Sequence, residues 1–129
     1  MPVKETHLTN AVYEQLRQAM AADPAGFTAL YQDYLADARE TLSILRESVQ
    51  ARHIENVRAK AHYLRSGSLV LGAADVARGA AMLEEAAIAG DSGSFEVLLE
   101  KIEMAVNATQ AELSERLESG APPADETAV

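Results

Sequence analysis

The chain has 129 residues, which suits one domain with a modest hydrophobic core. Hydrophobic residues make up 48% of it and aromatic residues 5%, with no Trp, and this composition favours helices over a β-sandwich. The formal net charge of −9 argues against nucleic acid as the main partner, and the lack of Cys excludes disulfides, thiolate metal sites and thiol nucleophiles.

Apolar residues recur at steps of three and four, the period of amphipathic helices. The pattern predicts a short first helix over residues 10–22, with Thr9 or Asn10 as its N-cap. An Asp-Pro pair at residues 23–24 then predicts the cap and first position of a second helix that continues to about residue 52. The expected buried residues of these two helices are Val12, Leu16, Met20, Phe27, Tyr31, Tyr34, Ala38, Leu42, Leu45 and Val49.

Three further helices are predicted, over residues 54–71, 74–89 and 95–117. Gly72 is expected to stop the first of these, and residues 90–94 form a turn rich in Gly and Ser before the last. The expected inward residues are Ile54, Val57, Ala61, Leu64, Ser68, Leu71, Val76, Ala80, Leu83, Ala87, Leu98, Ile102, Val106, Thr109, Leu113 and Leu117.

Short connections make neighbouring helices antiparallel, so the sequence predicts an all-α, up-down-up-down four-helix bundle with an extra short N-terminal helix. Residues 10–118 are expected to form this domain, after a flexible N-terminus at residues 1–9. Residues 119–129 contain Gly, a Pro pair and acids, and we expect a disordered tail because they bury too little apolar area to offset their ordering entropy.

The third predicted helix carries the most informative residues. Each helical residue turns about 100° around the axis, which places His62 roughly 130° from the centre of the apolar stripe and therefore toward solvent. Arg65 and Arg58, three residues later and four earlier, are its surface neighbours. The same exposed sector contains Ala59, Ser66, Leu69 and Val70. The last two residues leave packing and docking open as alternatives.

An exposed imidazole between two guanidinium groups suits phosphoryl chemistry. A neutral imidazole is nucleophilic, and histidine side chains near neutral pH are partly unprotonated. Arginine stabilises a transferred phosphoryl group through charge-assisted hydrogen bonds. Small neighbours would let a partner's active site approach, and the two apolar side chains would supply contact area.

The run from Ala61-His62 through Leu64 to Gly72-Ala73, with Leu83-Glu84 further on, resembles the histidine-phosphotransfer domains of multistep two-component relays. The usual family pattern is Ala-His-x-Leu-Lys-Gly, with Gly-Ala ten residues past the His and a later Leu-Glu pair. The resemblance extends over about residues 27–117. Two departures are that Arg65 replaces the usual Lys and Ser66 replaces the usual Gly. Arg65 keeps the charge but presents a planar fork.

The resemblance implies a phosphoryl carrier. The Nε2 atom of His62 would attack a phosphoaspartate on a receiver domain, and the phosphohistidine would then donate to an aspartate of another response regulator. Family members need no ATP site or cofactor of their own, and the Mg²⁺ used in transfer lies in the receiver. The expected partners are receiver domains and a hybrid or other sensor histidine kinase, and the expected oligomeric state is a monomer.

The sequence agrees with a carrier that is not a kinase, because it has no Walker-type loop and no kinase Gly-rich loop. No metal site is expected, since no His-x-x-x-His spacing occurs and no Glu lies three residues before a His. Residues 1–10 lack an apolar stretch, and no run of about 18 apolar residues occurs, so we expect no membrane span and a cytoplasmic location.

Two alternatives from other classes stay open. The same bundle could dock a kinase or receiver without carrying phosphate and act as a decoy or inhibitor, an alternative that the departures at Arg65 and Ser66 keep alive. A purely structural bundle with an outward histidine is the weaker alternative, because the later Leu83-Glu84 pair also matches the family pattern.

Overall fold

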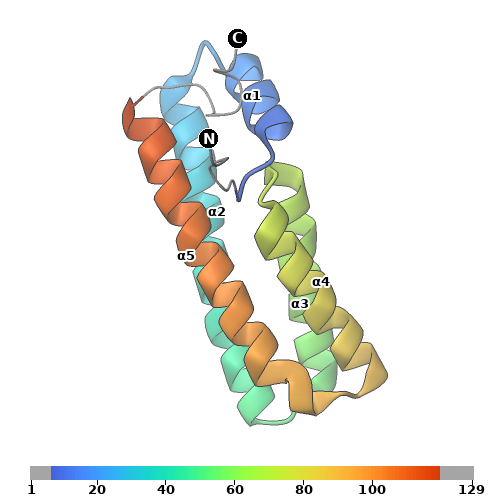
Figure 1. Ribbon diagram of the computed structural model, residues 1–129. Helices are drawn as coiled ribbons and strands as arrows, with labels where there is room; N and C mark the ends of the chain where they lie inside the picture. The colour runs from blue at the N-terminus through green and yellow to red at the C-terminus, as the bar shows by residue number, and fades with distance from the viewer. Residues whose placement is uncertain (1–6, 120–129) are drawn as a thin grey trace, which may run out of the picture.

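The computed structural model describes residues 7–119, and this part of the chain is an all-α bundle. The elements in chain order are α1 (Asn10–Ala19), α2 (Pro24–Gln50), α3 (Ile54–Leu71), α4 (Ala74–Ala89), the short 3-10 helix η1 (Ser92–Ser94) and α5 (Phe95–Ser119). Helices α2 to α5 run up-down-up-down, and α1 lies over one end of the bundle (Figure 1). Helix α2 packs against α3 and α5, and α4 packs against the same two, so α3 and α5 lie on the diagonal.

The helix boundaries follow the predicted ones closely, and the differences have local causes. Helix α1 ends at Ala19, three residues early, because the chain turns before the Asp23 side chain caps α2 by accepting the Gly26 N–H at 3.0 Å. Helix α2 ends at Gln50 because Arg52 adopts a left-handed conformation, with φ of 58°. Helices α3 and α4 have the predicted bounds, and α5 continues two residues further than predicted.

Gly72 closes α3 as predicted. Its φ of 75° is left-handed, a region that favours glycine, and a Cβ atom there would lie 2.9 Å from the Cβ of Val12. This tight turn brings α4 back along α3. No helix within residues 7–119 is both long and apolar enough to cross a membrane.

Most of the predicted inward residues of α2 to α5 are buried. Ile54 is the exception: it is 39% exposed because it begins α3 at the end of the bundle. In α1 the predicted residues are only half-buried, and the buried side chain is Tyr13, which was not expected. Its ring packs on Phe27 and Tyr31, with centroids 5.2 and 5.6 Å away. Half-buried positions are Val12, Leu16, Met20, Tyr34, Val49 and Leu117.

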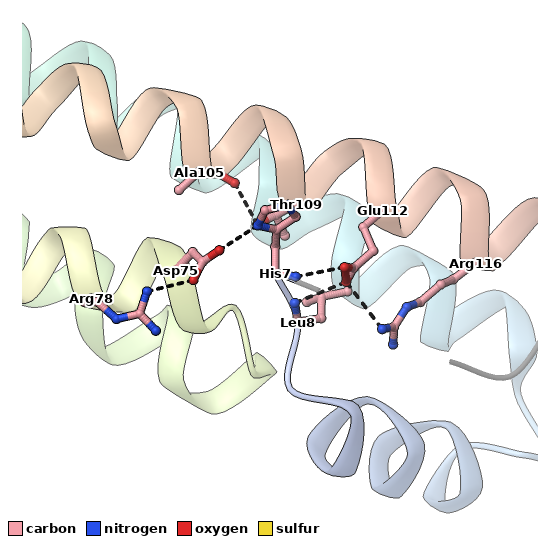
Figure 2. A network of polar contacts seen from close by, with 8 residues as sticks. All are labelled: His7, Leu8, Asp75, Arg78, Ala105, Thr109, Glu112 and Arg116. Atoms are coloured by element: carbon pink, nitrogen blue, oxygen red, sulfur yellow. Dashed lines mark hydrogen bonds and ion pairs between the residues drawn. The ribbon is translucent and has the colours of Figure 1, made fainter. Parts of the chain in front are cut away.

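The segment before α1 is packed where the structure describes it, which corrects the expected domain start at residue 10. Leu8 is buried and pairs with Ala73 in a backbone bridge. The carboxylate of Glu112 accepts the backbone N–H groups of His7 and Leu8 at 2.8 and 3.1 Å, and His7 Nδ1 lies 2.6 Å from Asp75 Oδ2 (Figure 2). The packed chain therefore includes residues 7–9, and residues 1–6 lie outside the described residues. Of the expected tail at residues 119–129, Ser119 is the last residue of α5, and residues 120–129 lie outside the described residues.

Leu64→Ala should destabilise the bundle by about 2–5 kcal/mol, because Leu64 is only 3% exposed and its loss leaves a cavity. The matched control is Leu69→Ala on the same helix, where the side chain is 60% exposed and a change within about 0.5 kcal/mol is expected. Urea unfolding monitored by circular dichroism measures both. Equal losses in the two variants would contradict the assignment of the buried face.

Asp75 should make stability depend on acid pH. Burial alone would raise the pKa of Asp75, but the hydrogen bonds from His7 and Arg78 outweigh it and hold the pKa below its usual 3.8. A depressed carboxyl pKa stabilises the fold above pH 3.8, and this contribution is lost as the pH falls through the folded value. Urea unfolding from pH 6 to 2 should therefore give the wild type a larger free energy of unfolding than Asp75→Asn at pH 6, and the difference should shrink as the pH falls. A difference that grows in acid would contradict a lowered pKa of Asp75.

Candidate functional site

His62 lies on the outward side of α3, where its side chain is 50% exposed. The inward side of the helix holds the buried residues Val57, Ala61, Leu64, Ser68 and Leu71. Because these residues recur every three or four positions, they fix the rotation of α3 and leave the imidazole at the edge that faces α4. The outward placement expected from the helical period is therefore observed.

Glu84 of α4 holds the ring of His62. Its Oε2 atom lies 2.9 Å from Nδ1 of His62, and the carboxylate is nearly buried, with 11% of the side chain exposed. Arg65 of α3 approaches the same two groups: Nη1 is 3.4 Å from Glu84 Oε1, and Nη2 is 3.5 Å from His62 Nδ1. The carboxylate thus lies within reach of both the imidazole and a guanidinium group.

This geometry assigns the ring proton. A carboxylate only accepts hydrogen bonds, whereas a guanidinium only donates them, so Nδ1 of His62 cannot serve both neighbours at once. The contact to Glu84 is the shorter by 0.6 Å (3.5 − 2.9), and it places the proton on Nδ1, which donates to the carboxylate. The neutral ring then carries its free electron pair on Nε2, the nitrogen away from Glu84.

Arg65 is partly used in the fold. Its side chain is 37% exposed, and its Nε is buried without a hydrogen-bond partner in the described chain. Glu84 Oε1 also lacks a hydrogen bond there, although Arg65 lies within ion-pair distance. Because the protonated Nδ1 of His62 cannot accept a hydrogen bond, the Nη2 group of Arg65, 3.5 Å away, keeps its donors for an anionic group at the imidazole.

Arg58 makes its hydrogen bonds with Glu55, while its charge also acts on Glu84. Its Nε lies 3.0 Å from both carboxylate oxygens of Glu55, and its Nη2 lies 2.6 Å from Oε1. These hydrogen bonds lower the pKa of Glu55, whose side chain is 79% exposed. Of the two arginines singled out in the sequence, the structure brings Arg65 to His62 and pairs Arg58 with Glu55. An exposed pair of this kind is weak and easily exchanged.

The four residues of α3 expected to contact a partner are all exposed. Ala59 and Ser66 are exposed, and Leu69 and Val70 are 60% and 70% exposed. Leu69 and Val70 are therefore not core residues. Ile88 of α4, one turn after Glu84, is 68% exposed and adds an apolar side chain that the sequence did not point to. Exposed apolar side chains are typical of a contact surface.

Glu84 is the functional side chain that the residues alone did not identify. It appeared only as half of the Leu83-Glu84 pair, with no role assigned. A usable signal was present, because an acid adjoins the buried stripe of α4 at a position where apolar residues are usual, and buried carboxylates are rare unless paired. Within residues 7–119, no group of three or more His, Asp or Glu side chains could hold a metal ion.

Comparisons with known proteins agree with this arrangement. The family model of the Hpt domain matches residues 29–119, most of the chain. The crystal structure of histidine-containing phosphotransfer protein B (HptB) from Pseudomonas aeruginosa PAO1 is similar, with a TM-score of 0.82 and 24% sequence identity over 90% of this chain and 98% of that chain. A search of curated protein sequences finds no match. The similarity to HptB confirms the predicted helical fold, and the family model confirms the resemblance: the chain belongs to the Hpt domain family, the histidine phosphotransfer proteins of phosphorelays.

Proposed function

We propose that His62 accepts a phosphoryl group from the phosphoaspartate of a receiver domain and passes it to an aspartate of another response regulator. The observation that carries this proposal is the contact of 2.9 Å between Glu84 and Nδ1 of a half-exposed His62. It leaves Nε2 as the nucleophilic nitrogen, on the side of the ring that a partner can reach.

In the proposed step, the electron pair of Nε2 attacks phosphorus, and the bond between phosphorus and the aspartyl oxygen breaks. The aspartate leaves as a carboxylate and takes the electron pair of that bond. The ring becomes a cationic phospho-imidazolium because its proton stays on Nδ1. The charge of Glu84 opposes that new positive charge at hydrogen-bond distance, so it stabilises the ring more after attack than before. Return of the phosphoryl group to a second aspartate reverses these changes.

Arg65 is the proposed phosphoryl-binding residue. It occupies the place of the family's Lys, and its guanidinium already lies 3.5 Å from the ring. A planar guanidinium can donate two parallel hydrogen bonds to two phosphoryl oxygens. A Lys ammonium lacks this fixed geometry. Arg58 has a secondary role in this proposal: once negative charge arrives on His62, its exposed pairing with Glu55 is weak enough to be exchanged for the phosphoryl group.

The partner surface in this proposal is the outward side of α3. Ala59 and Ser66 are small enough to let a receiver's active site approach the ring, while Leu69 and Val70 supply apolar contact. The proposal assigns no cofactor to this chain and puts the Mg²⁺ of transfer in the receiver. Sensor kinases carrying receiver domains are the proposed source of phosphoryl groups. A monomeric chain and a cytoplasmic location remain predictions.

Transfer of labelled phosphate tests the proposal. Purified chain is incubated with Mg²⁺ and a panel of radiolabelled phospho-receiver domains, and His62→Ala serves as the control. The expected result is a label that is stable in base, labile in acid and absent from the variant, because a phosphoramidate on His62 has those properties. His62→Ala should stay folded, although the loss of the hydrogen bond to the nearly buried Glu84 should cost about 1–3 kcal/mol.

Binding measured on the same panel separates the alternative. A receiver that binds the wild-type chain but leaves no label on it would contradict phosphotransfer and support a decoy or inhibitor of the kinase or receiver. Unfolding of His62→Ala would instead contradict the exposed placement of the ring.

A further inference from the structure

The outward side of α3 has a second edge, formed with α2. Tyr63, the residue after His62, is 52% exposed, and its hydroxyl donates a hydrogen bond of 2.7 Å to Oδ2 of Asp37 on α2. This bond and the charge of Asp37 raise the pKa of Tyr63. Adjacent helical residues differ by about 100°, so His62 and Tyr63 border the outward side of α3, with Ser66 and Val70 in the sector between them.

The two edges differ in their charged groups. The edge toward α4 has the guanidinium groups of Arg58 and Arg65, which pair with the carboxylates of Glu55 and Glu84. The edge toward α2 has the exposed carboxylate of Asp37, with Glu40 close enough to act on Tyr63 and Asp33 one turn away. Lys60 is the nearby cation on this edge. Its Nζ lies 5.9 Å from the centroid of the Tyr63 ring, and among the described residues it makes no ion pair with Asp37.

We infer that Tyr63 and Asp37 form a second contact for the receiver and select receivers that present a Lys or Arg side chain about one helix width from their phosphorylated aspartate. This inference rests on the proposed function, because the occupant is the same receiver that exchanges phosphate with His62. The phosphorylated pocket, which is anionic, meets the edge with Arg65, and the cationic side chain meets Asp37. Only one orientation of the receiver satisfies both edges.

The chemistry of the pair suits this role. Tyrosine is enriched in interfaces because it offers a large, rigid contact area with a polar end. The hydrogen bond to Tyr63 holds the Asp37 carboxylate in place before a partner arrives, so less side-chain freedom is lost on binding. Charges at the rim of an interface mainly change the rate of association and its dependence on salt. The pair should therefore govern which receivers bind and leave the chemical step at His62 unchanged.

Kinetics of transfer from the receiver that labels the wild-type chain fastest would test the inference. Asp37→Lys should raise KM for the phospho-receiver about tenfold and leave kcat within about twofold, because it affects encounter and not chemistry. The rise should shrink as NaCl is increased, since salt screens exposed charges. The matched control is Glu100→Lys on α5, the helix diagonally opposite α3 and its His62, which changes net charge equally and should leave KM unaltered. Asp37→Asn, which removes the negative charge without adding a positive one, should give a smaller rise in KM.

Equal KM values for Asp37→Lys and Glu100→Lys, with label on His62 intact, would overturn the inference and leave the proposed function standing. Restored KM after replacing the receiver's cationic side chain by Glu would confirm the contact. Titration of the unphosphorylated receiver gives a readout that does not need phosphate. Weaker binding of Asp37→Lys than of Glu100→Lys would support the contact even if no label reached His62. The absence of label would count against phosphotransfer but not against the contact.

Discussion

The contact between Glu84 and His62 is the interaction on which the proposed chemistry depends, and it exists only because α4 lies close to α3. The turn at Gly72 brings α4 back along α3, and a side chain there would collide with Val12. Ala61 of α3 and Ala80 of α4 are small and fully buried, and residues of this size allow two helices to pack closely. The bundle thus delivers a carboxylate from one helix to the histidine of the next.

Burial of Glu84 has a cost that the site itself offsets. A nearly buried carboxylate is unfavourable unless it is paired, and the two side chains that contact it, His62 and Arg65, belong to the proposed site. The substitution of Arg for the family's Lys then has a structural reading, because one planar guanidinium reaches towards the carboxylate and the ring together. The same residue supports the folded arrangement and is the proposed ligand of the phosphoryl group.

Periodicity in the sequence was sufficient to predict the helices of the bundle and the outward direction of His62, because buried apolar residues fix the rotation of each helix. Caps such as Asp23 and Gly72 marked boundaries for the same local reasons. The packing of Tyr13 and Leu8 could not be predicted, since it depends on where α1 and the preceding segment cross the end of the bundle. The contact between His62 and Glu84 joins residues 22 positions apart on different helices, so only their packing reveals it.

The protonation of the His62 ring in the free chain tests the central claim most directly. Long-range ¹H–¹⁵N spectra at mildly alkaline pH distinguish the two ring nitrogens. The account predicts that Nδ1 carries the proton and Nε2 does not, and that Glu84→Ala, but not Glu85→Ala at the exposed neighbouring position, shifts the proton toward Nε2. A proton on Nε2 in the wild-type chain, or no change in Glu84→Ala, would contradict the claim that Glu84 prepares His62 for attack.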